Sequence, residues 1–151
     1  MASGLVRSGE GIAFPYAGTP LRVLAGGDGD GTAAWAAGEL VVPAHFHGPI
    51  PHVHETFDEA LYLIEGTLLV VTGWDEVQEA PAGSLFTALR GTRHTFSNPT
   101  DTPARVLGIW TPAREGLDFM RAVGAVLPAA GPPDPEVMRD VYERHHSHLQ
   151  P

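Results

Sequence analysis

Short apolar runs, each closed by turn-forming residues, follow one another through the middle of the chain, and they most constrain how it can fold. Their length and spacing are typical of β-strands, and they lack the 3.6-residue period of a helix. Clear turn sequences stand at residues 72–75 and 98–103. The sequence therefore predicts an all-β sandwich or barrel. The expected strands are a weak edge strand at Leu21–Leu24, then Ala33–Val42, Ala60–Thr72, Gly83–Leu89, His94–Ser97 and Arg105–Trp110.

Residues 113–151 carry a helical pattern instead. Apolar side chains in residues 115–126 fall close to one helical face. Asp134 followed by Pro135 has the pattern of an N-cap with proline at the first helical position, which predicts a second helix. A chain of 151 residues suits one domain. We therefore expect residues 1–112 to form the barrel with its N-terminal edge strand, and residues 113–151 to form a helical tail packed on it.

Composition excludes several kinds of chemistry and partner. The chain has no cysteine, so any metal must be held by nitrogen and oxygen. The net charge is −9, and a net-acidic chain without a basic run is a poor candidate for binding nucleic acid or an anionic membrane. Lysine is absent, which excludes Schiff-base catalysis. Neither a long apolar stretch nor a secretory leader stands out, so we expect a cytoplasmic protein.

Histidines gather in one short segment. His45, His47, His52 and His54 fall within residues 45–54. Residues i and i+2 of a strand point the same way, so His52 and His54 can present two imidazoles to one interior point, and so can the other pair. Each buried imidazole needs a partner, so two such pairs are costly as core filler alone.

The carboxylate that would accompany these histidines is ambiguous from the residues alone. A strict period of two selects Asp58, four residues after His54. Glu59 lies five residues on and would face outward from an unbroken strand. For Glu59 to join the site, residues 55–58 must contain a bulge or a turn.

Two stretches of the chain resemble the two sequence motifs of the cupin superfamily. The first motif is His-x-His, four residues, a glutamate, six residues and a glycine, here His52, His54, Glu59 and Gly66. The second is a glycine, five residues, Pro-x-Gly, two residues, a histidine, three residues and an asparagine, here Gly83, Leu89-Arg90-Gly91, His94 and Asn98. Leu89 stands where proline is usual, and Gly48 lies closer to His52 than the opening glycine of the first motif usually does.

The resemblance implies a fold and a metal site. The fold is the cupin double-stranded β-helix, a jelly-roll barrel, here with a C-terminal two-helix tail. The implied ligands of one divalent transition metal ion are His52, His54, Glu59 and His94. Three imidazoles and one carboxylate suit iron, manganese, nickel, copper or zinc, and they leave coordination positions open for a small-molecule substrate.

Within the superfamily, the chain looks most like the small single-domain bacterial quercetinase-like proteins. That likeness implies a metal-dependent dioxygenase acting on a small aromatic or enolisable substrate, with Glu59 as catalytic base or as a ligand. Two alternatives stay open. One is a non-redox isomerase, cyclase or lyase that uses the metal as a Lewis acid, and the other is a non-catalytic cupin that binds a metal or a small molecule.

Residues near the motifs complete the expected substrate pocket. Leu61, Leu63 and Phe96 share the strand parity of the ligands, and we expect them to form apolar pocket walls. His47 either reaches the cavity mouth or, like His45, occupies an edge or interface position bonded to backbone.

Surface residues suggest how the protein meets its surroundings. We expect Trp74, at a hairpin tip, to be an exposed aromatic anchor in a homodimer with exchanged edge strands. Arg90 and Arg93 are expected to pair with surface acids. The histidines within residues 145–148 are expected to be solvated cations at a helix C-terminus, where the helix dipole favours them.

Overall fold

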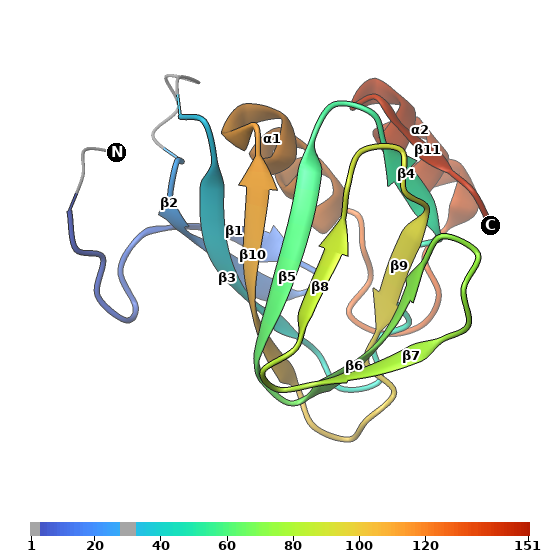
Figure 1. Cartoon of the computed structure of the whole chain (residues 1–151), viewed down its shortest axis with the longest axis horizontal. Helices are drawn as coiled ribbons and strands as arrows, with labels where there is room; N and C mark the ends of the chain where they lie inside the picture. The colour runs from blue at the N-terminus through green and yellow to red at the C-terminus, as the bar shows by residue number, and fades with distance from the viewer. Residues whose placement is uncertain (1–3, 28–32) are drawn as a thin grey trace.

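The computed structural model describes residues 4–27 and 33–151. Its strands are β1 (Ile12–Tyr16), β2 (Thr19–Ala25), β3 (Ala36–Val42), β4 (His52–His54), β5 (Asp58–Glu65), β6 (Thr67–Thr72), β7 (Gln78–Pro81), β8 (Leu85–Ala88), β9 (His94–Ser97), β10 (Ala104–Thr111) and β11 (Ser147–Leu149). They form two antiparallel sheets that face each other, as the sequence predicts (Figure 1). The six-stranded sheet has the order β1-β2-β3-β10-β5-β8, and the five-stranded sheet has the order β11-β4-β9-β6-β7.

Alternation along the strands turns one face of each sheet inward. Every second residue of β3 is buried from Ala36 to Val42, and β10 repeats the pattern. The inward side chains of the two sheets pack into one core, which includes Leu40, Leu68 and Val106. A metal site between the sheets therefore requires polar residues at a few of these inward positions.

The predicted run Ala60–Thr72 is in fact divided between the two sheets. β5 ends at Glu65, and β6 starts at Thr67 in the other sheet. Gly66 between them has a φ of +84°, and a Cβ there would stand 2.9 Å from the Cα of Ala104. Glycine alone tolerates both conditions, so it marks the point where the chain changes sheets. The sequence pattern predicts a single strand here because both halves of the apolar run are buried.

Three strands were not predicted from the sequence. β1 forms the edge of its sheet, so β2, which contains the expected edge strand Leu21–Leu24, lies between β1 and β3. β7 and β11 have only four and three residues and carry polar side chains, so they offer no apolar run. Their strand character comes from pairing with a neighbour and not from their own pattern.

The tail contains two helices, α1 (Ala113–Gly124) and α2 (Pro135–Arg144), before β11. The side chain of Asp134 accepts hydrogen bonds from the backbone of Glu136 and Val137, as its N-cap pattern predicts. α2 and β11 lie beside β4 at one end of the sandwich (Figure 1). The tail thus adds a strand to the five-stranded sheet. No helix within the described ranges is long and apolar enough to cross a membrane.

Candidate metal centre

The four predicted ligands lie together between the sheets. His52 and His54 are on β4, Glu59 is on β5 and His94 is on β9. His52 and His94 oppose each other directly across the β4–β9 pair. None of the four residues is more than 5% exposed. Two strands of one sheet and one strand of the other therefore deliver the whole set to one buried point.

The break in the strand that Glu59 requires is present. β4 ends at His54 and β5 begins at Asp58 in the other sheet, so residues 55–57 redirect the chain. Glu59 is consequently buried, while Asp58 turns outward to Arg90, whose Nη2 lies 2.9 Å from its Oδ2. The alternative carboxylate, Asp58, is outside the cluster, and Arg90 pairs with a surface acid as expected.

Backbone carbonyls fix the tautomers of two imidazoles. The Nδ1 of His52 lies 2.8 Å from the carbonyl oxygen of Ile50, and the Nδ1 of His94 lies 2.9 Å from that of Thr92. A carbonyl oxygen can only accept a hydrogen bond, so each Nδ1 carries the proton. In the neutral ring the Nε2 atom then carries no proton, and its lone pair is free to bind a metal ion or to accept a hydrogen bond. Ligand nitrogens of the three histidines lie within 4.8 Å of one another.

His54 is held by a side chain from the tail. Its Nδ1 lies 2.9 Å from the Oγ of Ser147, and that hydroxyl donates in turn to the carbonyl of His145 at 3.3 Å. A hydroxyl that donates onward accepts from Nδ1–H, which again leaves Nε2 without a proton. Among the described residues, the buried Nε2 atoms of His54 and His94 have no hydrogen-bond partner.

Charge in the cluster is set by burial and by close neighbours. Burial lowers the pKa of His52, and repulsion from His94 and His54 lowers it further. Burial also lowers the pKa of His54, by more than the neighbouring Glu59 raises it. Burial raises the pKa of Glu59, but the adjacent His54 and His94 lower it by more, so the net shift is downward. Oε2 of Glu59 lies 3.4 Å from Nε2 of His94 and 3.9 Å from Nε2 of His54. Its Oε1 accepts a hydrogen bond of 2.9 Å from Nε1 of Trp110.

A bound cation would relieve the repulsion between the acceptor atoms that face one another in this cluster. Bare imidazole nitrogens and an ionised carboxylate oxygen are all acceptors, and acceptors buried face to face repel one another unless a positive ion or a proton lies between them. The donor set of imidazole nitrogens and one carboxylate suits a divalent transition metal. The residues present therefore fit the metal that the resemblance implies.

Aromatic rings surround the imidazoles. Phe57 stacks on His54 with ring centroids 4.0 Å apart. Phe119 of α1 lies edge-on to His54 at 4.6 Å, and Tyr142 of α2 lies edge-on to His52 at 4.7 Å. The hydroxyl of Tyr142 is buried without a hydrogen-bond partner among the described residues, and burial raises its pKa. The two helices of the tail thus close one side of the cluster.

Sequence reasoning missed the residues that support the ligands. Trp110 opposes Glu59 across the β10–β5 pair, and Ser147 opposes His54 across the β11–β4 pair. These partners are 51 and 93 positions apart in the chain, so no spacing rule connects them. Only the register of the strands could have indicated them.

The residues expected to line a substrate pocket at the metal centre lie either in the packed core or on the surface. Leu61, Leu63 and Phe96 are at most 4% exposed and belong to the packed core. His47 is exposed and, with His45, borders a separate hollow on the outside of the barrel. The structure therefore does not bring His47 to the metal centre.

The surface residues Trp74, Arg93 and His148 agree only in part with what the sequence predicts. Trp74 is 78% exposed, as expected, and the guanidinium of Arg93 lies 4.5 Å from its ring centroid. Arg93 donates to the carbonyls of Gly73 and Gln150, so the expectation that it pairs with an acid is wrong. In the tail, His148 lies on β11, where its Nε2 is 3.0 Å from Oε1 of Glu55, so the expectation that it lies at a helix C-terminus is wrong.

Known proteins share sequence and fold with this chain. Residues 31–110 match the family model of the cupin domain. A tetracenomycin polyketide synthase protein, TcmJ of Streptomyces glaucescens, is 38% identical over 84 residues, which are 54% of this chain and only 56% of that relative.

Solved structures share the fold. An RmlC-like cupin from Shewanella frigidimarina has a TM-score of 0.62 at 16% identity, covering 77% of this chain and 96% of that one. KdgF from a Halomonas species has a TM-score of 0.56 at 21% identity, covering 66% and 84%. These two structures share the fold, and the family match shows that the chain belongs to the cupin family.

Proposed function

We propose that this cupin is a metal-dependent dioxygenase that acts on a small phenolic or enolisable molecule. The observation that carries the proposal is the buried cluster of three imidazoles and one carboxylate with its acceptor atoms facing one another. When a redox-active divalent ion is held by His52, His54, Glu59 and His94, it supplies Lewis acidity toward an enol or phenol oxygen and electron transfer to dioxygen.

Glu59 can act in two ways, and its environment favours one of them. Trp110 fixes Oε1, while Oε2 faces the histidines. Oε2 could take the proton of an enol hydroxyl, and the resulting anion is electron-rich enough to react with dioxygen, whose two atoms would both enter the product. A general base works best with a pKa near the working pH. Because Oε2 lies 3.4 Å from Nε2 of His94 and 3.9 Å from Nε2 of His54, among the other ligand atoms, the ligand role is favoured.

A non-redox cyclase or isomerase is the second candidate. The similarity to a polyketide synthase protein favours it, because polyketide chains carry enolisable carbonyl groups. Ring closure of such a chain requires an enolate and an acceptor carbonyl but no oxidant. The same four ligands could serve that reaction through Lewis acidity alone.

Oxygen uptake separates these candidates. The protein is analysed for metal as purified, then loaded with iron, manganese or nickel and mixed with a panel of flavonols, phenols and β-polyketones. The proposal expects uptake of one dioxygen per substrate consumed by at least one metal form, and none by a His54→Ala variant. Arg114→Ala, at an exposed position on α1, is the matched control and should behave like the wild type.

Each other result has a definite meaning. Substrate loss without oxygen uptake supports the cyclase or isomerase. Tight binding without turnover of any compound supports the non-catalytic alternative. Purified protein without metal, combined with no metal uptake on loading, contradicts all the metal-dependent candidates.

A further inference from the structure

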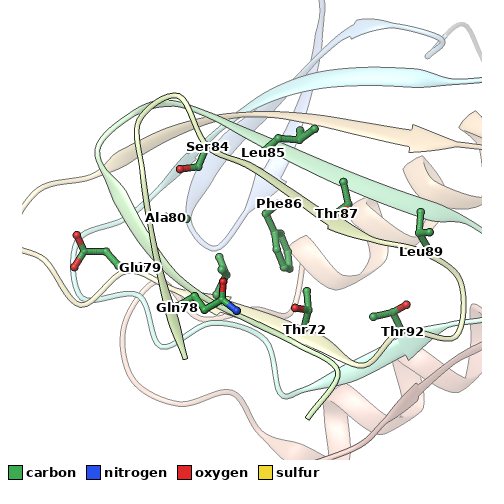
Figure 2. Close-up of a pocket in the computed structure, with 11 residues that line it drawn as sticks. Thr72, Gln78, Glu79, Ala80, Ser84, Leu85, Phe86, Thr87, Leu89 and Thr92 are labelled. Carbon is green, nitrogen blue, oxygen red and sulfur yellow. The ribbon is translucent and has the colours of Figure 1, made fainter. Parts of the chain in front are cut away.

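A cavity of about 450 Å³ opens where β7 and β8, the adjacent edges of the two sheets, come together (Figure 2). Its size lies within the range of small-molecule pockets in proteins. Residues of β6, β7 and β8 line it, together with Leu89 and Thr92 from the loop that leads to β9. None of the residues that the sequence suggested as pocket walls takes part in it.

This cavity approaches the metal centre on the His94 side. Thr92, in its lining, supplies the carbonyl that fixes the His94 imidazole, and Thr72 opposes His94 across the β6–β9 pair. Phe86 points from β8 into the same space (Figure 2). Its ring centroid lies 6.2 Å from that of His94, and the side chain is only 6% exposed. A single aromatic ring thus belongs both to the cavity wall and to the surroundings of the ligands.

The side of the centre that faces the two helices is closed more completely. Phe119 and Tyr142 pack against each other at 5.0 Å and against His54 and His52, and neither is more than 3% exposed. Entry there would require α1 and α2 to separate. On the cavity side, the Phe86 ring belongs to the lining and lies 6.2 Å from the His94 ring. Rotation of one side chain is a far smaller and faster change than separation of two packed helices.

The lining indicates which molecules the cavity suits. Thr72, Gln78 and Thr92 offer neutral hydrogen-bonding groups beside the apolar surfaces of Phe86 and Leu89. Among the described lining residues, the only ionisable side chain is Glu79, an acid, and there is no cation. A phosphate or a carboxylate would therefore lose its hydration without gaining a counter-charge. A flat neutral ring that carries hydroxyl or carbonyl groups suits such walls.

We infer that the substrate of the proposed function reaches the metal centre through this cavity, that Phe86 controls its passage, and that it is an uncharged polyhydroxylated ring compound. The inference rests on the proposed function for the presence of the metal. It adds the route, the controlling residue and the exclusion of phosphorylated or carboxylated substrates.

Coordination of a flavonol to zinc-loaded protein tests the route without turnover, because the flavonol absorption band shifts when its oxygens bind the metal. Phe86→Trp and Leu89→Trp both fill the cavity, and Leu89 is 62% exposed, so its replacement leaves the core intact. We expect each variant to keep its metal and to slow flavonol association about tenfold or more. Ile64→Trp, on the outer face of β5, is the control and should match the wild type.

Two further outcomes separate the inference from the proposed function. Equal association rates in the wild type, Phe86→Trp and Leu89→Trp would overturn the route while leaving the proposed function intact. Absence of any band shift in the zinc-loaded wild type would overturn the inferred route and substrate class, whereas the proposed function would still be decided by oxygen uptake with the other compounds of the panel. Tighter binding of a flavonol phosphate than of the neutral flavonol would overturn the substrate class alone.

Discussion

At the scale of single residues, hydrogen bonds to Nδ1 of the three histidines decide which ring nitrogen of each can bind a metal. The carbonyls of Ile50 and Thr92 keep Nδ1 protonated in two rings, and Ser147 does the same in a third. Each Nε2 atom is therefore prepared to bind a metal before any metal arrives. Such outer partners commonly change metal affinity by about 10–100-fold when removed. The orientation of the rings is thus as informative about function as the identity of the ligands.

Trp110→Phe should destabilise the metal-free protein by about 1–3 kcal/mol, because it leaves the buried Oε1 of Glu59 without its donor. Urea unfolding of the metal-free protein measures the change. Trp74→Phe is the matched control, since Trp74 is 78% exposed, and its effect should stay within about 0.5 kcal/mol. If the two variants lose equal stability, the Trp110–Glu59 hydrogen bond contributes nothing measurable.

Stability of the metal-free protein should fall as the pH drops below the ordinary histidine pKa of 6.5. The pKa values of His52 and His54 are lowered in the folded state, so the unfolded state binds protons first and the slope of unfolding free energy against pH is positive. Chemical denaturation between pH 5 and 8 measures it. His54→Gln should reduce the slope, because the folded state then has one histidine fewer with a lowered pKa. Because His52 still contributes, a smaller slope should remain, and a slope as steep in His54→Gln as in the wild type would contradict the assignment.

The ligands could be predicted from the sequence, and their supporting partners could not. His52, His54 and His94 followed from strand parity and motif spacing, and Glu59 followed from the motif once a break after His54 was assumed. Trp110 lies on another strand, where its side chain meets Glu59 only because of the pairing register. A local pattern holds no information on register between strands that are distant in the chain.

At the scale of elements, β11 shows how a short segment without an apolar pattern acquires a role. It has three residues, and it pairs with the strand that carries two of the histidines. A prediction that treated the tail as helices alone therefore missed a link to the centre. Strand β4, also of three residues, is found from sequence only because its histidines are conspicuous.

Ser147→Ala should weaken metal binding by about 10–100-fold, because the His54 ring loses the partner that fixes its tautomer. Competition with a chromophoric chelator gives the affinity. Ser97→Ala, a half-buried serine on β9, is the matched control and should bind metal like the wild type. A Ser147→Ala protein with unchanged affinity would show that His54 needs no partner from the tail.

Asp134→Ala should loosen α2, since the N-cap side chain satisfies the backbone N–H groups of Glu136 and Val137. We expect a loss of about 1 kcal/mol, visible as faster hydrogen exchange in residues 135–144. Asp134→Asn keeps the cap and should exchange like the wild type. Equally slow exchange in Asp134→Ala would mean that packing alone holds the helix.

At the scale of the whole molecule, the centre connects parts that are otherwise separate. Its ligands come from both sheets, and Ser147 ties one of them to the tail. The topology of two facing sheets was predictable because binary patterning decides which faces are buried. The division at Gly66 was not, because a change of sheet leaves the apolar pattern intact.

Metal removal should therefore lower the stability of the entire fold and not only of one loop. At a free metal concentration 100 times the dissociation constant, binding adds about 2.7 kcal/mol, which corresponds to roughly 5–10 °C in Tm for a protein of this size. Thermal unfolding with added metal and with excess chelator measures the difference. The His94→Ala variant should show a smaller difference in Tm than the wild type, because only three of the four ligands remain. A wild-type Tm that chelator leaves unchanged in protein shown to have lost its metal would mean that the cluster is stable without a cation, with a shared proton between Glu59 and His94 in its place.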